Sequence, residues 1–409
     1  MTHPTSHKVL ILGGGYAGLM AASRVARGNS LAEVTLIDAR PTFTQRIRLH
    51  ETLAGRKPAT LDYAPLLGRR GVRFVQARVE SLEPHRNRVL ARSLDGLPVE
   101  HRYDTLILAL GSHTRASAPG VAEHAVRLDD PAAVRKAAAR ITMLAGTGGR
   151  VLVAGAGLTG IESATELAER HPGLRVTLAT RGRVGDGYSE AGSAHLRRRL
   201  IELGVEILDD TSLASLEPGR AWLENGGSLP FDLCVWAGGF EAPALAREAG
   251  LAVDSAGRAL VDPALRAQGH PEIFVAGDAA VATLPDGRAI RMGCVSAMPL
   301  GAHAGETVVR LLRGQEPEPF AFGFTIRCIS LGRKDGLVQS VEPDDTPLPR
   351  VRTRRTASIV KELICRMTYE IPRWELSTGA RLYRWPGPGR PLVKSTTGPA
   401  APEARQSHG

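Results

Sequence analysis

Two segments of the chain carry the same pattern of residues at a constant offset of 142 positions. The first reads KVLILGGGYAGLMAASRVARGNSLAEVTLID and ends at Asp38; the second reads RVLVAGAGLTGIESATELAERHPGLRVTLATR and begins at Arg150. Each starts with a short apolar run, continues through glycines spaced GxGxxG and a stretch of small residues, and ends with a second apolar run. This order predicts a strand, a tight turn, a helix and a second strand, present twice.

The glycine spacing indicates what the two turns bind. Glycines let backbone N–H groups approach a pyrophosphate at the positive end of a helix, and an acid at the end of the second strand accepts hydrogen bonds from a ribose. Two such turns predict two bound dinucleotides. The candidate residues are Gly13, Gly14, Gly15, Tyr16, Ala17, Gly18, Asp38 and Ala39 in the first unit, and Gly155, Gly157, Thr159, Gly160 and Arg181 in the second.

The two units differ where the second strand ends. Asp38 suits a free ribose diol, whereas Thr180, Arg181 and Arg183 at the equivalent place suit a ribose that carries a 2′-phosphate. The second unit is therefore predicted to favour NADPH over NADH. The alternative is that the two arginines are ordinary solvated cations of a loop.

Three further apolar runs, at 103–111, 231–239 and 271–278, end at glycines and are predicted to be buried strands. The last brings Asp278 to a place where it could hold the ribityl hydroxyls of a flavin. A helix predicted after Pro299 would stabilise negative charge on the flavin pyrimidine ring through its N-terminus, unless it is an ordinary amphipathic core helix. Together with Arg46 and Val79, these segments supply the candidates Ala109, Gly111, Gly239, Gly277, Asp278 and Ala297.

Composition narrows the class of protein. A net charge of +10 favours an anionic surface or an acidic protein partner, but only 4% of the residues are aromatic and the arginines are scattered, which argues against nucleic acid. The four cysteines form no CxxC pair, which predicts inert thiols and no metal site. Because no run approaches the ~20 apolar residues of a membrane-spanning helix, we expect a cytoplasmic protein, or one attached peripherally to the cytoplasmic membrane face.

These motifs together resemble the FAD-dependent pyridine nucleotide-disulfide oxidoreductases. Within that family, the chain is most similar to the branch of type II NADH dehydrogenases and ferroptosis-suppressor, apoptosis-inducing-factor-like proteins. The resemblance covers residues 8 to 340 and rests on GGGYAGL, YDTLILALGS, GAGLTGIESATELAE, CVWAGGF, IFVAGDAA and SLGRKDGLV. It implies that the first unit and Asp278 bind FAD and that the second unit binds NAD(P)H. It also implies a catalytic Glu162 beside the two ring systems, although Glu162 could instead complement the dipole of its helix.

The resemblance also suggests an electron acceptor. Disulfide-reducing members have a cysteine pair after the first unit, whereas residues 41–51 here contain no thiol, and only Cys328 suits a sulfide:quinone reductase. Reduced flavin must then meet its acceptor directly or pass single electrons to a carrier, and quinone is the first choice of acceptor. The alternatives are an acidic ferredoxin or rubredoxin as acceptor, or a redox sensor without turnover, and the protein could be a monomer or a homodimer. The cations Arg46, Arg48 and His50 could line the flavin site or simply be surface charge.

The predicted fold is α/β, with two Rossmann-like, three-layer dinucleotide-binding domains and a small C-terminal cap. We assign residues 1–115 and 250–320 to the FAD domain, 116–249 to the NAD(P) domain, 321–385 to the cap and 386–409 to a disordered tail. In the cap, Ile359, Leu363 and Met367 share one face of a predicted helix, with Lys361 and Glu362 on the other. We favour a core-facing apolar side; a quinone doorway or a membrane-facing patch is the alternative.

Overall fold

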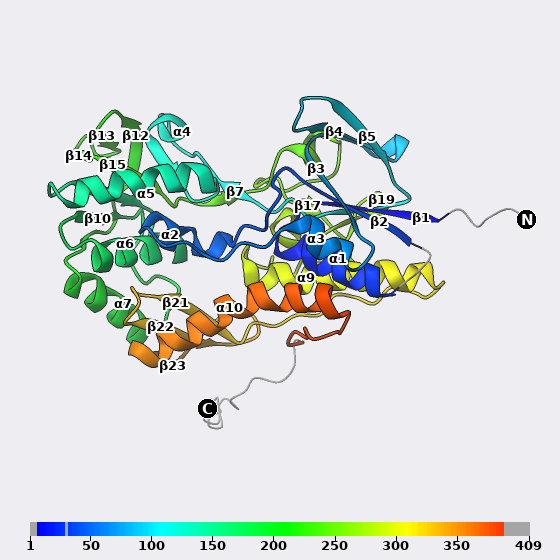
Figure 1. The fold of residues 1–409 in the computed structure, drawn as a ribbon. Helices are drawn as coiled ribbons and strands as arrows, with labels where there is room; N and C mark the ends of the chain where they lie inside the picture. Colours follow the sequence, from blue (N-terminus) through cyan, green and yellow to red (C-terminus); the bar gives the residue numbers. More distant parts are fainter. Residues whose placement is uncertain (1–5, 29–31, 388–409) are drawn as a thin grey trace, which may run out of the picture.

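The computed structural model describes residues 6–28 and 32–387, which include two neighbouring sheets with parallel centres (Figure 1). The first sheet has the order β18-β19-β6-β1-β2-β3-β4-β5. Its central pairs are parallel, whereas β4, β5 and β18 are antiparallel additions at the edges. The strands are β1 (His7–Leu12), β2 (Ala32–Asp38), β3 (Arg73–Glu83), β4 (Arg88–Ser93), β5 (Pro98–Arg102), β6 (Thr105–Leu108), β18 (Arg266–Ala267) and β19 (His270–Val275).

The second sheet repeats the central part of the first. Its five strands, in the order β11-β10-β9-β15-β8, are all parallel to their neighbours. Parallel strands need helical crossovers, so helices cover the sheet, and its central strands β9 and β15 are mostly buried and apolar. The strands are β8 (Ala125–Arg127), β9 (Arg150–Ala154), β10 (Arg175–Ala179), β11 (Glu206–Leu208) and β15 (Leu233–Trp236).

Short strands extend or connect the two sheets. β7 and β16 pair where the chain crosses from one sheet to the other and back, and β12, β13 and β14 form an antiparallel meander beside the second sheet. β17 and β20 form a separate parallel pair. Their bounds are β7 (His113–Thr114), β12 (Leu213–Glu217), β13 (Arg220–Leu223), β14 (Ser228–Pro230), β16 (Phe240–Glu241), β17 (Ala259–Leu260) and β20 (Ala280–Val281).

Both predicted turn–helix units are present, and the helix predicted after Pro299 begins earlier than predicted. α1 starts at Tyr16 directly after the glycine turn, and α9 starts at Cys294, so that Pro299 lies inside the helix. The helices before the cap are α1 (Tyr16–Gly28), α2 (Leu49–Leu53), α3 (Tyr63–Gly68), α4 (Val121–His124), α5 (Pro131–Ala145), α6 (Leu158–Arg170), α7 (Glu190–Glu202), α8 (Leu245–Glu248) and α9 (Cys294–Leu312).

α1 and α9 pack backbone to backbone over the first sheet. A side chain at Gly301 would lie 2.1 Å from the carbonyl oxygen of Ala17, and one at Gly305 would lie 2.7 Å from that of Ala21. Glycine at both positions therefore allows the two helices to approach more closely than ordinary side chains permit. This close packing fixes the N-terminus of α9 beside the first glycine turn.

The C-terminal segment joins both halves of the molecule. β21 (Ile326–Ser330), β22 (Gly336–Val341) and β23 (Pro347–Thr353) form an antiparallel sheet beside the second unit. α10 (Arg354–Thr378) then runs back alongside α1 (Figure 1). Pro386, within the predicted tail, accepts a hydrogen bond from Gly323, and the remainder of that tail from 388 lies outside the described residues.

The orientation of α10 contradicts the favoured prediction. Ile359, Leu363 and Met367 are 59%, 57% and 47% exposed, whereas the Lys361 side chain is only 14% exposed and Glu362, which is half-buried, pairs with Arg48 and Arg333. The reason is electrostatic, because both charged residues find oppositely charged partners on other elements. The assignment of residue ranges to domains remains a prediction.

Candidate active site

A cavity of about 1060 Å³ lies where the strands of both sheets end. The carboxyl ends of parallel strands are the usual place for ligands in α/β folds. Most of the predicted site residues line this cavity, namely Gly13, Gly15, Tyr16, Ala17, Asp38, Ala39, Arg46, Val79, Ala109, Gly111, Gly157, Thr159, Glu162, Gly277, Asp278 and Ala297. The predicted residues outside its lining are Gly14, Gly18, Gly155, Gly160, Arg181 and Gly239.

The first glycine turn fits the close approach of a pyrophosphate. Gly13 has a φ of +97°, and a side chain at Gly18 would lie 1.8 Å from the carbonyl oxygen of Gly13. Gly18 therefore serves the packing of the turn, whereas Gly15 has no atom near its absent side chain and borders the cavity. The Asp38 carboxylate accepts hydrogen bonds of 2.8 Å from the backbone N–H groups of Gly14 and Arg40.

The second glycine turn has the same backbone design. Gly155 has a φ of +104°, and a side chain at Gly160 would lie 1.8 Å from the carbonyl oxygen of Gly155. Gly157 corresponds to Gly15, because it too has open space and borders the cavity. The strand end differs, since Arg181 is exposed and forms no ion pair within the described parts of the chain.

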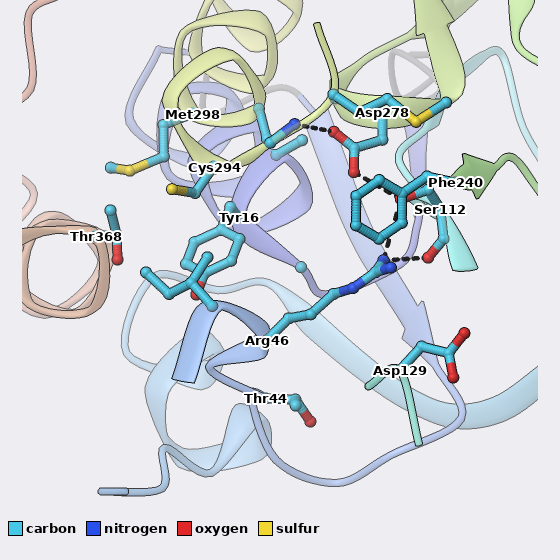
Figure 2. Close-up of a pocket in the computed structure, with 18 of the residues that line it drawn as sticks. Tyr16, Thr44, Arg46, Ser112, Asp129, Phe240, Asp278, Cys294, Met298 and Thr368 are labelled. Carbon is cyan, nitrogen blue, oxygen red and sulfur yellow. Dashed lines mark hydrogen bonds between the residues drawn. The ribbon is translucent and has the colours of Figure 1, made fainter. Parts of the chain in front are cut away.

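Asp278 anchors a hydrogen-bonded chain along one wall of the cavity (Figure 2). Its carboxylate accepts hydrogen bonds of 2.7 Å from the Ser112 hydroxyl and from the backbone N–H of Gly293, which precedes α9. Arg46 donates to the Ser112 hydroxyl at 3.1 Å and to the Ser112 carbonyl, and its guanidinium lies 5.1 Å from the centre of the Phe240 ring. The predicted Asp278 thus orders the N-terminus of α9 through Gly293.

Glu162 also lines the cavity and lies in a buried cluster of charges. Lys361 of α10 contacts one carboxylate oxygen at 3.0 Å, and the backbone N–H and hydroxyl of Ser330 donate to that oxygen at 3.1 Å. Nδ1 of His50 lies 3.8 Å from the other oxygen. Burial alone would raise the pKa of Glu162, but the charge of Lys361 and the hydrogen bond from the backbone of Ser330 outweigh it and the net pKa is lowered. Glu162 is therefore an ionised carboxylate at neutral pH.

The surroundings shift the pKa values of His50 and Lys361 in opposite directions. Burial lowers the pKa of His50, with Glu162 and Glu51 only partly offsetting it, so the imidazole is held neutral. Burial would also lower the pKa of Lys361, but Glu162 more than compensates and the pKa lies well above its usual value. The site thus combines a carboxylate, an ammonium and a neutral imidazole.

Several residues of the site are not predictable from the sequence. The predicted helix places Lys361 on its solvent side, and Ser330 enters the prediction only as the first residue of the SLGRKDGLV motif. Of the three cations after β2, Arg46 and His50 line the cavity, whereas Arg48 is buried in ion pairs with Glu51 and Glu362. Three distant cysteines also converge on the cavity, and burial raises the pKa of each thiol, so they are protonated: Cys294, Cys328 and Cys365.

The fold and the site together define a two-dinucleotide oxidoreductase. The chain belongs to the pyridine nucleotide-disulphide oxidoreductase family, whose model matches residues 7–301. It is 31% identical over 348 residues to an NADH dehydrogenase-like protein of Mycobacterium tuberculosis, covering 80% of this chain and 86% of the relative. It is 29% identical over 367 residues to a type II NADH:quinone oxidoreductase of Staphylococcus epidermidis, covering 81% and 89%.

Solved structures show the same fold at lower identity. NDH2 from Plasmodium falciparum, in complex with NADH, superposes with a TM-score of 0.77 over 95% of this chain and 100% of that chain, at 14% identity. The sulfide:quinone oxidoreductase of Aquifex aeolicus has a TM-score of 0.77 over 91% and 92%, at 19% identity. The predictions of an α/β fold with Rossmann-type units, of oxidoreductase activity, and of FAD and a nicotinamide cofactor are confirmed.

Proposed function

We propose that the protein oxidises NAD(P)H through FAD and reduces a quinone. The observation that carries this proposal is the apolar end of the cavity, which is lined by residues of α10. Among them, Met367 borders the cavity and is also 47% exposed, so the cavity reaches the apolar row formed by Ile359 and Leu363 on the surface. A flat apolar ring with two carbonyl oxygens suits such an opening better than a protein carrier does.

Different parts of the chain would bind the two cofactors and handle the proton. The first unit, with Asp278 and the N-terminus of α9, would hold FAD, which when bound accepts hydride and passes electrons on. The second unit would hold the nicotinamide cofactor against it, with Gly157 and Thr159 at the cavity wall. Glu162 would orient the carboxamide or accept a proton, and Lys361 keeps Glu162 ionised for that role.

The exposed face of α10 supports a peripheral contact with a membrane. Ile359, Leu363, Met367 and Trp374 form its apolar row, and Arg366 beside them is exposed and can meet anionic lipid headgroups. No helix within residues 6–28 and 32–387 is long and apolar enough to cross a bilayer. We therefore propose that the protein lies on the membrane surface with this row facing the lipid, from which a quinone would enter.

The strand end of the second unit supports NADPH as the preferred donor. Thr180 stands where a carboxylate would accept hydrogen bonds from a free ribose diol, and Arg181 beside it is exposed without an ion-pair partner among the described residues. A 2′-phosphate would supply the negative charge that this loop lacks.

An acceptor screen with the yellow protein tests the proposal. We expect rapid bleaching of flavin absorbance on mixing with NADPH, slower bleaching with NADH, and steady turnover with a short-chain quinone. A protein acceptor such as a ferredoxin would instead give rates that fall steeply with added salt, because the +10 charge would steer it. Bleaching without turnover on any acceptor would favour a redox sensor, and a colourless protein that takes up no FAD would exclude the whole scheme.

A further inference from the structure

One face of α6 carries three carboxylates that lead away from the cavity. Glu162, Glu166 and Glu169 are spaced at i, i+4 and i+7, so neighbouring side chains lie about 6 Å apart on the helix surface. Glu162 borders the cavity, whereas Glu166 lies one turn behind it and has no place in the reaction described above. Glu169 is neutralised by Arg199 at 2.8 Å and accepts a hydrogen bond from the backbone of Arg333.

Glu166 is buried without a complete set of partners. Its side chain is 2% exposed, and Oε1 lies 3.3 Å from Nε of Arg56, whose own side chain is 41% exposed. Oε2 has no hydrogen-bond partner among the described residues, and neither does Nε2 of the buried His50. The charged and titratable groups that act on Glu166 come from α2 and the loop after it, from the β21–β22 turn and from α6 itself, namely Glu51, Arg56, Arg333 and Glu169.

The proposed reaction needs a proton from solvent. NAD(P)H delivers one hydride, which carries two electrons and one hydrogen, whereas a quinone becomes a hydroquinone by gaining two electrons and two protons. One further proton must therefore reach the buried cavity in each turnover. Glu162 is not suited to hold this proton at neutral pH, because its lowered pKa keeps the carboxylate ionised.

We propose that Glu166 is a proton-relay residue, which takes up this proton beside Arg56 and passes it along α6 to the Glu162–His50 pair. The inference rests on the proposed quinone reductase function. Burial, opposed by Arg333, raises the pKa of Glu166 to about 7, so that at neutral pH the group alternates readily between its two protonation states. Oε2 of Glu166 and Nε2 of His50 both lack a hydrogen-bond partner among the described residues, and bridging waters at these two atoms would complete the path.

The test compares Glu166→Gln with the native holoenzyme. We expect kcat with a short-chain quinone to fall about 10-fold or more, with a larger solvent isotope effect and little change in KM. Flavin bleaching by NAD(P)H without acceptor should change less than about 2-fold, because hydride transfer takes no proton from solvent. Infrared spectra across a pH titration supply a readout independent of turnover: a protonated-carboxyl band with a midpoint near pH 7 should be present in the native protein and absent in Glu166→Gln.

Glu169→Gln is the matched control, because it removes a carboxylate from the same face of α6 while leaving the relay intact. Its kcat should stay within about 2-fold of the native value, and Glu166→Asp should recover part of the lost turnover. Equal losses in Glu166→Gln and Glu169→Gln, an unchanged isotope effect, or the absence of the titrating band would each overturn the relay. If the native protein bleached but reduced no quinone, the proposed function itself would fail, a result distinguishable from failure of the relay alone.

Discussion

The two glycine turns share one backbone design and have different surroundings. Around the first, α9 and α10 cover α1, and both oxygens of Asp38 are held by backbone N–H groups. Around the second, the strand end is open at Thr180 and Arg181. A closed site suits a cofactor that stays bound, whereas an open one suits a cofactor that exchanges in every turnover. The glycine motif thus predicts that a dinucleotide binds, and the elements packed around each turn predict whether that dinucleotide stays bound or exchanges.

The largest effects should come from alanine at the packing glycine of each turn. Either Gly18→Ala or Gly160→Ala places a methyl group 1.8 Å from a carbonyl oxygen, so the turn must open. We expect Gly18→Ala to yield protein without FAD, visible as loss of yellow colour. Gly160→Ala should remain yellow but no longer bleach with NAD(P)H.

Alanine substitutions at Gly15 and Gly157, the glycines that border the cavity, test cofactor binding without disturbing the packing of the turns. Gly15 and Gly157 have no atom within 4 Å of the position of an added side chain, so both variants should melt at the native temperature in the absence of cofactors while losing cofactor affinity. Retention of FAD by Gly18→Ala, or loss of FAD from Gly160→Ala, would remove the distinction between the two turns.

The next largest effect concerns the helices that follow the turns. At equivalent positions of α1 and α6 lie Met20, which is fully buried in the core, and Glu162, which borders the cavity. Glu162→Gln should lower turnover about 100-fold, because it removes the carboxylate that Lys361 holds ionised, while FAD stays bound. Met20→Leu keeps the volume of the core and should leave turnover unchanged. Steady-state kinetics at equal flavin content decide between these outcomes.

The difference between the two helices also marks the limit of prediction from sequence. The glycine turns and the strand that leads to Asp278 were predictable because their signals lie within a few neighbouring residues. The contact between Glu162 and Lys361 was not, since it joins segments almost two hundred residues apart. Hydrophobic periodicity places Lys361 and Glu362 toward solvent, but the ion pair with Glu162 buries Lys361 at the cavity, and Glu362 pairs with Arg48 and Arg333. Pairing of buried charges across a tertiary contact has no local signature.

A smaller effect should appear in the pH dependence of stability. Equivalent positions of α1 and α6 hold Arg24, neutralised by Glu375 at 3.0 Å and Glu306 at 3.4 Å, and Glu166, which Arg56 contacts through one oxygen. Burial raises the pKa of Glu166 from 4.5 to about 7, so the folded protein binds more protons than the unfolded chain between these values. Stability should therefore fall as pH rises through this window, by about 3 kcal/mol at most, and level off above it.

Urea unfolding at several pH values measures this slope. Glu166→Gln has no carboxyl to titrate, so its slope between pH 4.5 and 7 should be flatter than that of the native protein by the contribution of this one group. If stability depended on pH in the same way in both proteins, Glu166 would be ionised in the folded protein across this pH range. Arg56 would then neutralise Glu166 as fully as Glu375 and Glu306 neutralise Arg24.

The smallest effect should arise at the strand ends, where the two units differ by Asp38 and Thr180. Thr180→Asp restores an acceptor for a free ribose diol and repels a 2′-phosphate, so the ratio of kcat/KM for NADPH over NADH should fall about 10-fold, and Arg181→Ala should lower it further. The reverse exchange, Asp38→Thr, removes the acceptor for the N–H groups of Gly14 and Arg40 and should weaken FAD retention without altering the choice of donor. If Thr180→Asp left the ratio unchanged, the open strand end would not select the donor, and the arginines would be ordinary loop cations.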